Sequence, residues 1–488
     1  MAEASPVAPE IFVGGRFVIP VSGRAYPNIN PATGAQVGVA ADAEPADMEA
    51  AIGAAHDALE QTSWARCPEA RYRAINQLYD VLTRNRDEWR RLFVLEGGAP
   101  VQIARGGFFD AAIETLPYWA KMARDYEYEQ SLPDQQFPHG VSRRTVVREP
   151  VGVVAAIVPW NSPFQLALAK IVPALAAGNS VVLKPAPDTP WSGLIIARAV
   201  AQTDIPPGIF NVVTSSANEI GDTLTGDVRV NMVTFTGSTA VGKHVAARGA
   251  QTVKRVTLEL GGKSAFIALD DGDPQAVAAM AAAQISFHAG QGCALLTRLL
   301  LPRSRYKEGV EAVAEAMSKI TFGDPFDPAS QMGPLISQRQ LDRVLGYIEA
   351  GKREGARLVL GGNRGPGPGF FVEPTLFADV RPESTIAQEE IFGPVLSVIP
   401  YDTEDDAVAI ANGTKYGLSS GVMGSPDRAA AIARRLRAGS CSVNGGVWYG
   451  VDSPFGGYRE SGVGRENGVQ GFEEYLETKV VAETVVPA

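Results

Sequence analysis

Short, continuous apolar runs alternate with helical segments between Val146 and Leu260. The runs read as buried strands: VVREPVGVVAAIVPW (146–160), SVVLKP (180–185), IFNVV (209–213), VNMVTF (230–235) and VKRVTLEL (253–260). Strands of this kind, separated by helices, form parallel sheets covered on both faces. The pattern predicts a doubly wound α/β domain, in which ligands bind at the carboxyl ends of the strands.

The flanking regions extend this architecture. Residues 46–126 have apolar positions at helical spacing, and the segment FVGGRFV (12–18) is typical of a hairpin. After residue 261, further strands are expected at TRLLLP (297–302), ARLVLGG (356–362), VLSVIPY (395–401) and SCSVN (440–444). These strands indicate a second α/β domain.

We therefore divide the chain into three parts. Residues 1–126 and 150–261 form a dinucleotide-binding domain of the Rossmann type, and residues 262–461 form a catalytic α/β domain. Residues 127–149 and 462–488 are interpreted as a small β element for oligomerisation, because an exposed terminal strand often pairs with another chain. The alternative is that these two pieces cover their own domain.

Composition narrows the class of protein. The net charge of −10 argues against nucleic-acid binding. The N-terminus lacks the charged and apolar regions of a secretory signal, and prolines interrupt the apolar stretch 151–183, so no membrane span is expected. Three cysteines without a CxxC pair and four scattered histidines predict neither disulfides nor a metal site. We expect a soluble cytoplasmic protein.

Several motifs fall at the carboxyl ends of the predicted strands. Gly237, Ser238 and Gly242 form a Gly-Ser-x-x-x-Gly turn at a helix start, which suits a phosphate but also serves simple capping. Lys184 can meet a ribose or a phosphate, and is otherwise a surface lysine. Asn161 has an amide that can donate to an oxyanion, although Asn before Ser-Pro is also a common turn residue.

Three further segments carry candidate chemistry. Glu259 lies among apolar residues before two glycines, where burial raises a carboxyl pKa towards the range of a general base. Glu390 and Phe392 can grip a nicotinamide riboside, or simply connect a helix to a strand. The glycine- and aromatic-rich segment 444–466 suits a loop that lines an apolar pocket, or a self-packed surface loop.

Cys293 stands in the glycine turn GQGCALLTR (290–298). A lone cysteine usually packs as a small hydrophobe. Together with this cysteine, however, the ordered motifs PWN, KP, FTGS, LELGGK, GQxC, EEIFGPV and SPFGGY resemble the aldehyde dehydrogenase superfamily over essentially the whole chain.

The resemblance implies roles for individual residues. Cys293 would be the nucleophile, Asn161 and the Cys293 backbone N–H the oxyanion donors, and Glu259 the base that activates water; Lys170 would belong to the same catalytic group. The implied cofactor-binding residues are Pro159, Trp160, Lys184, Pro187, Phe235, Gly237, Ser238, Gly242, Leu260, Glu390 and Phe392. The implied substrate pocket contains Ser162, Leu166, Tyr449 and Phe455, with Ala169, Gly292 and Ala294 nearby.

Departures from the family pattern bear on the cofactor and the substrate. Members that prefer NAD usually carry a glutamate at the position of Pro187; here Asp188 follows, and no arginine or lysine stands beside it in the sequence. We expect NAD, with NADP possible. Ala240 replaces a glutamate that many relatives have. Small side chains in the implied pocket predict medium-sized or bulky hydrophobic aldehydes.

The resemblance predicts an NAD(P)-dependent, non-acylating aldehyde dehydrogenase that works as a dimer or tetramer. The alternatives are a coenzyme A-acylating relative, which would generally lack the glutamate at position 259, a catalytically silent structural relative, and a metal-free thiol hydrolase. The last would need neither the FTGS turn nor Lys184.

Overall fold

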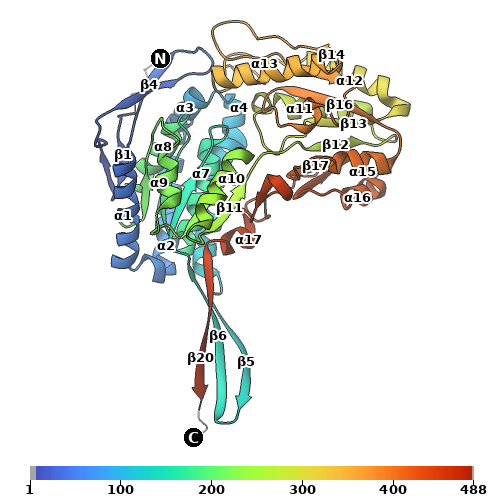
Figure 1. Ribbon diagram of the computed structural model, residues 1–488. Coiled ribbons are helices and arrows are strands. Elements are labelled where there is room, and N and C mark those ends of the chain that lie inside the picture. The colour runs from blue at the N-terminus through green and yellow to red at the C-terminus, as the bar shows by residue number, and fades with distance from the viewer. Residues whose placement is uncertain (1–6, 486–488) are drawn as a thin grey trace.

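The computed structural model in Figure 1 describes residues 7–485 of the chain. Residues 1–6, in the segment for which we expect no secretory signal, and residues 486–488, at the end of the predicted tail strand, lie outside the described residues. Across the described part, every helix is too short or too polar to traverse a lipid bilayer.

A large, mainly parallel sheet forms the first half of the molecule. In spatial order it contains β19 (Gly462–Val463), β11 (Arg255–Glu259), β10 (Met232–Thr236), β7 (Val153–Ile157), β8 (Ser180–Lys184), β9 (Phe210–Val212), β1 (Ile11–Val13) and β2 (Arg16–Val18). The strands β11 to β9 are parallel, and the predicted hairpin β1–β2 is confirmed at the edge.

Alternating side chains of these strands bury against helices on opposite faces, as the apolar runs predict. Val153 and Ala155 belong to one core cluster, whereas Val154 and Ala156 belong to the other. The first face is covered by α1 (Pro45–Gln61), α9 (Ile220–Gly226) and α10 (Thr239–Ala250). The second face is covered by α2 (Pro68–Arg84), α3 (Arg86–Gly97), α6 (Leu116–Asp125), α7 (Pro163–Ala177) and α8 (Pro190–Val200).

Shorter elements complete this half. The hairpin of β3 (Ala25–Ile29) and β4 (Gln36–Ala41) precedes α1. Between α3 and α6 the chain forms α4 (Val101–Ile103), a π-helical turn (Ala104–Phe108) and α5 (Asp110–Ile113). The helix α17 (Gly468–Glu473) lies near the end of the chain.

The second half contains another sheet with helices on both faces, which confirms the predicted α/β class. Its order is β14 (Arg357–Leu360), β15 (Thr375–Ala378), β16 (Val395–Tyr401), β13 (Arg298–Pro302), β12 (Ala265–Ala268), β17 (Ser419–Met423) and β18 (Ser440–Val443), with β14 antiparallel. One face packs on α11 (Pro274–Ser286) and α12 (Tyr306–Ser318). The other packs on α13 (Gln338–Arg353), α14 (Thr385–Gln388), α15 (Glu404–Asn412) and α16 (Pro426–Ala433).

A narrow antiparallel sheet projects from the body as an arm (Figure 1). It consists of β5 (Glu129–Phe137), β6 (Gly140–Pro150) and the tail strand β20 (Leu476–Val485). The tail strand pairs with β6 of its own chain from Leu476↔Pro150 to Val485↔Val141. The β-prone tail predicted from the sequence is thus a strand, and its partner within the chain is the segment 141–150.

The prediction of one strand over residues 146–160 is wrong. Residues up to Pro150 belong to the arm, whereas β7 begins at Val153 in the large sheet. The change occurs at Gly152, whose φ is +124°, and a Cβ there would lie 2.2 Å from the Asn231 side-chain oxygen. Only glycine suits a positive φ with so little space. Because valines flank Gly152, the sequence alone does not indicate that the chain changes direction there.

Candidate active site

Cys293 follows a tight turn with left-handed backbone. His288, Ala289 and Gly290 have φ values of 46°, 53° and 70°. A Cβ at Gly290 would lie 2.1 Å from the backbone oxygen of Gly393. The turn is therefore in backbone contact with the EEIFGPV segment, and it leaves Cys293 half-buried with a free thiol. Strained backbone of this kind clusters at functional sites.

Replacing Gly290 by alanine is expected to lower the free energy of unfolding by more than ~1 kcal/mol, because the positive φ and the carbonyl of Gly393 both oppose a Cβ. Urea unfolding measures the change. The matched control is Gly346→Ala on the exposed face of α13, where a Cβ meets nothing within 4 Å. An alanine there should leave stability unchanged or raise it. Equal stability of both variants would contradict this account of the turn.

Asn161 is attached to the nucleophile turn. It lies just past β7, is 7% exposed, and its Nδ2 donates to the backbone oxygen of Gln291, 3.0 Å away. The Gln291 side chain in turn donates to the backbone oxygens of His288 and Pro334. Because an amide nitrogen carries two hydrogens, Asn161 keeps one for a further acceptor beside Cys293.

Glu259 ends β11 and is 3% exposed. Within residues 7–485, neither of its carboxylate oxygens meets a hydrogen-bond partner. Burial first, and the negative charge of Glu466 second, raise its pKa well above the usual value, while Lys170 acts in the opposite direction. A buried carboxyl with a raised pKa and free oxygens is suited to accepting a proton.

Lys170 forms a buried ion pair that sequence reasoning does not find. Its ammonium group, on α7, donates to the Glu466 carboxylate and to Thr234 Oγ1, the latter at 3.2 Å. Glu466 stands at the end of the glycine-rich segment 444–466, where nothing in the local pattern distinguishes it from a surface residue. Both members of the pair act on the pKa of Glu259: Glu466 raises it and Lys170 lowers it.

The Cys293 thiol shares this environment. Burial raises its pKa well above the usual value, and the charges of Glu259 and Glu390 raise it further. The thiolate is the nucleophilic form of cysteine, so the thiol must lose its proton to a neighbouring group before it can attack. Glu259, whose carboxylate oxygens have no partner and whose charge raises the pKa of the thiol, is the candidate for receiving that proton.

Most of the implied cofactor residues lie at one edge of the large sheet. The strand register pairs Ile157 with Lys184 and Thr236 with Glu259, so the loops that follow these strands are neighbours. Ser238 caps α10 by accepting from the Val241 N–H at 3.4 Å. The residues brought to this edge are Pro159, Trp160, Lys184, Pro187, Phe235, Gly237, Ser238, Gly242 and Leu260.

Buried polar groups at this edge fit a polar ligand such as a dinucleotide. Lys184 is 4% exposed, and burial lowers its pKa to about 8, with Glu219 acting in the opposite direction. Thr236 Oγ1 is buried and has no hydrogen-bond partner among residues 7–485. A cation and a hydroxyl beside a helix N-terminus are suited to phosphate and sugar oxygens.

Glu390 and Phe392 reach the same region from the second half of the chain. Glu390 Oε1 accepts from the Gly262 N–H at 2.9 Å, and burial raises the pKa of its carboxyl to about 7. The Phe392 ring contacts the Trp160 ring edge-on at 5.3 Å. The two halves thus meet where the predicted cofactor residues converge.

The implied substrate residues form a connected group. Ser162 Oγ donates to Gln165 Oε1 at 2.8 Å, and Gln165 Nε2 donates to the Tyr449 hydroxyl at 2.9 Å. The Tyr449 and Phe455 ring centroids are 5.5 Å apart. Leu166 is buried on the same helix, α7. Gln165 and Trp448, whose ring stacks on Phe455 at 5.6 Å, are two members that the sequence prediction omits.

Asp188 has a basic neighbour that the sequence does not reveal. Arg339, on α13, lies 3.7 Å from the Asp188 carboxylate. Burial raises the pKa of Asp188, and Arg339 acts in the opposite direction. No arginine or lysine is next to Asp188 in the sequence, as expected, but the fold brings Arg339 close to it.

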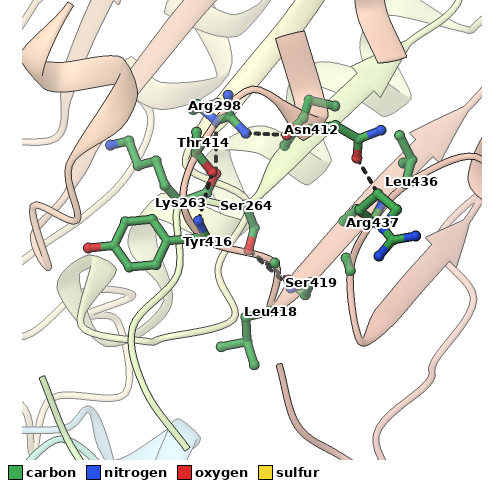
Figure 2. A pocket seen from close by; sticks show the side chains of 15 residues that line it. Lys263, Ser264, Arg298, Asn412, Thr414, Tyr416, Leu418, Ser419, Leu436 and Arg437 are labelled. Carbon is green, nitrogen blue, oxygen red and sulfur yellow. Dashed lines mark hydrogen bonds between the residues drawn. The ribbon is translucent and has the colours of Figure 1, made fainter. Parts of the chain in front are cut away.

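A second polar cluster lies behind the LELGGK segment (Figure 2). Lys263 is 2% exposed, and its amine has no hydrogen-bond partner in the described part of the chain. Burial lowers its pKa to about 7, and nearby Arg298 lowers it further. Arg298 itself donates to the backbone oxygens of Lys263, Ile410 and Ala411. The cavity here is about 20 Å³, room for a single water molecule.

Residues 7–485 hold no group of three His, Cys, Asp or Glu side chains arranged for a metal ion. Cys293, Glu259 and Asn161 together supply a thiol, a buried carboxyl with free oxygens and an amide donor. This set can form and then cleave a covalent bond to an electrophilic carbon.

Comparisons with known proteins agree with this chemistry. The family model described as "Aldehyde dehydrogenase family" matches residues 17–481. The geranial dehydrogenase of Castellaniella defragrans is 40% identical, over 96% of this chain and 98% of its own. The structure of a Mycobacterium tuberculosis aldehyde dehydrogenase complexed with NAD+ has a TM-score of 0.92 at 43% identity, covering 97% of both chains. A Staphylococcus aureus betaine aldehyde dehydrogenase with NAD+ has a TM-score of 0.95 at 32% identity, covering 98% and 95%.

Proposed function

The chain belongs to the aldehyde dehydrogenase family, and we propose that it oxidises a medium-sized or bulky hydrophobic aldehyde to the carboxylic acid with NAD. The observation that carries the proposal is the convergence of Cys293, Asn161 and Glu259 from separate elements on one point. The free oxygens of Glu259 favour hydrolysis over transfer to coenzyme A, and the retained set argues against a silent relative.

The first step is proposed to occur at sulfur. The thiolate of Cys293 attacks the aldehyde carbon, a carbon–sulfur bond forms, and the carbonyl electron pair moves to oxygen. The oxyanion accepts hydrogen bonds from Asn161 Nδ2 and from the Cys293 backbone N–H. Losing one such donor typically costs about 10²–10³ in rate.

NAD, when bound, accepts the hydride that leaves the aldehyde carbon. On this chain, Lys184 and the N-terminus of α10 would hold its phosphate and sugar groups, and Glu390 and Phe392 its nicotinamide riboside. The buried Lys184 amine and the unpartnered Thr236 hydroxyl support this assignment. The product at Cys293 is a thioester.

Hydrolysis completes the reaction. Glu259 takes a proton from water while the water oxygen bonds to the thioester carbon; the carbon–sulfur bond then breaks, the acid leaves and the thiolate is restored. The positive charge of Lys170 opposes the rise in the Glu259 pKa that burial and Glu466 cause, and it keeps more of this base in its proton-accepting form.

The substrate class rests on the three rings of Trp448, Tyr449 and Phe455 and on the likeness to geranial dehydrogenase. We expect kcat/KM for citral and benzaldehyde to exceed that for acetaldehyde or a semialdehyde acid by at least about tenfold, the ratio that one or two extra buried methylenes supply. We also expect NAD to be preferred to NADP, because the Asp188 carboxylate accepts a ribose hydroxyl and repels a phosphate.

A steady-state screen of these aldehydes with both nicotinamide cofactors measures both expectations. Betaine aldehyde belongs in the series, because aromatic rings also attract quaternary ammonium groups and a betaine aldehyde dehydrogenase is among the similar structures. A preference for acetaldehyde, a semialdehyde acid or betaine aldehyde would contradict the hydrophobic class. Preference for NADP would indicate that Arg339 accepts the additional phosphate.

We propose that the arm carries the contacts of a dimer or tetramer, in keeping with the three-part division at residues 1–126 and 150–261, 262–461, and 127–149 with 462–488. Val480 and Val481 on β20 are 59% and 41% exposed, and an exposed apolar strand favours pairing with another copy. A cytoplasmic location is proposed with it, since all three cysteines are free.

Replacing Val480 and Val481 by glutamate is expected to lower the mass in solution from an oligomer to a smaller species, measured by light scattering. Val253→Glu is the control, because Val253 is 91% exposed outside the arm. A double variant with the mass of the original protein would rule out the arm as the contact.

A further inference from the structure

A cavity of about 150 Å³ lies beside the residues that follow Cys293, of which Ala294 and Leu296 line it. Its lining residues lie on α11, β12, β17 and β18, in the segment 294–296 and in the segment after β18. Figure 1 shows α11, β12 and β17 together in the second half of the chain. Cys293, Asn161, Glu259 and Glu390 are not among the lining residues. The cavity is therefore distinct from the reacting group of side chains.

Most side chains in the walls are apolar, and polar atoms form almost half of the lining surface. Phe266, Leu296 and Val422 are 2%, 7% and 1% exposed and line the cavity together with Met280 and Trp448. A cavity of about this volume has room for a benzene-sized molecule. The polar side chains in the lining, Gln284 and Ser442, are already engaged by neighbours: Gln284 Oε1 accepts from the Leu296 N–H at 3.0 Å, and Ser442 Oγ donates to the Gly446 oxygen at 2.8 Å.

The lining also touches the reacting site indirectly. Ala294, the residue after Cys293, forms part of the wall, and its backbone oxygen accepts from Ser419 Oγ at 2.5 Å. Trp448 contributes to the wall and stacks on Phe455. An occupant of the cavity would press on the segment 294–296 and on the aromatic group of the implied substrate pocket.

We propose that this cavity is a second binding site, which takes a compact apolar molecule with a single aromatic ring while an aldehyde occupies Cys293. The volume selects the size of the ligand, and the satisfied polar groups select against ligands that need several hydrogen bonds. Met280, half-buried on α11, forms the wall that is easiest to change, because it takes no part in the reacting group.

Fluorobenzene is a suitable probe, followed by fluorine NMR. We expect saturable binding at this cavity, with a loss of affinity of at least about tenfold in Met280→Trp, whose larger side chain fills the space. Met280→Leu, which conserves volume, is the matched control and should bind as the original protein does. Ser442→Leu fills the cavity from the opposite wall and keeps the test decisive if the tryptophan variant does not fold.

A second experiment distinguishes binding in this cavity from binding at Cys293. In a Cys67→Ser, Cys441→Ser background, iodoacetamide blocks Cys293 alone, which intact mass confirms. We expect the alkylated protein to bind fluorobenzene with unchanged affinity. Loss of binding on alkylation would place the probe at Cys293 and overturn the proposal. Absence of saturable binding, or unchanged affinity in both cavity-filling variants, would overturn it as well.

Discussion

Replacing Cys293 by alanine is expected to abolish aldehyde oxidation, with kcat lowered by at least about four orders of magnitude, as for other covalent nucleophiles. Alanine removes the sulfur that bonds to the aldehyde carbon, and no other thiol can substitute, because Cys67 and Cys441 are outside the site. The rate of NADH formation measures the effect.

Cys67→Ala and Cys441→Ala are the controls for this result. Both thiols are free and partly buried, so the same deletion is made in similar surroundings. These variants should retain activity within about twofold, the range expected for residues remote from the chemistry. Substantial turnover by Cys293→Ala with a folded circular dichroism spectrum would contradict covalent catalysis.

Replacing Glu259 by glutamine is expected to separate the two halves of the reaction. Glutamine keeps the shape of the side chain but cannot accept the proton of water, so steady turnover should fall by about 10²–10⁴, the usual contribution of a general base. A single burst of NADH, close to one equivalent per site, should still appear once the thiol is deprotonated by solvent at alkaline pH.

Rapid-mixing absorbance at the NADH band distinguishes the burst from the slow phase that follows. Glu460→Gln is the control, because Glu460 is a carboxylate on the protein surface paired with Lys243 and Lys415. Normal turnover by Glu259→Gln would show that another group activates water. A loss of both the burst and the turnover at alkaline pH would make Glu259 essential to the first step as well.

The raised pKa of Glu259 gives this step a definite pH dependence. Burial and Glu466 shift the pKa upward, so the proton-accepting form is depleted as the pH falls through that raised value. Deacylation should therefore slow as the pH falls, with a midpoint at a higher pH than an ordinary glutamate would produce.

The positions of Asn161, Lys184, Ser238 and Glu259 follow from the sequence because each ends a strand or begins the helix after one. Parallel strands bring such residues to one edge, and the apolar runs identify the strands. The same reasoning fails for the Lys170–Glu466 pair, because a buried charge far along the chain leaves no local pattern. The proximity of Arg339 to Asp188 could not be predicted for the same reason.

The ends of a strand can be predicted from the sequence only where turn-forming residues such as glycine or proline stand beside it. The short strands β12, β15 and β17 are not predicted because AFIA, TLFA and SSGVM carry few β-branched residues at regular spacing. The corner at Gly152 is not predicted because valines stand directly on both sides of this glycine, at positions 151 and 153. The contact of Gly290 with Gly393 joins segments a hundred residues apart in a way that only the folded chain reveals.

The most direct test of covalent catalysis is the intact mass of the Glu259→Gln variant, quenched in acid during turnover with NAD and an aromatic aldehyde. The account predicts an added acyl group, which peptide mapping places on Cys293. Accumulation of the carboxylic acid with no adduct at Cys293 would contradict it.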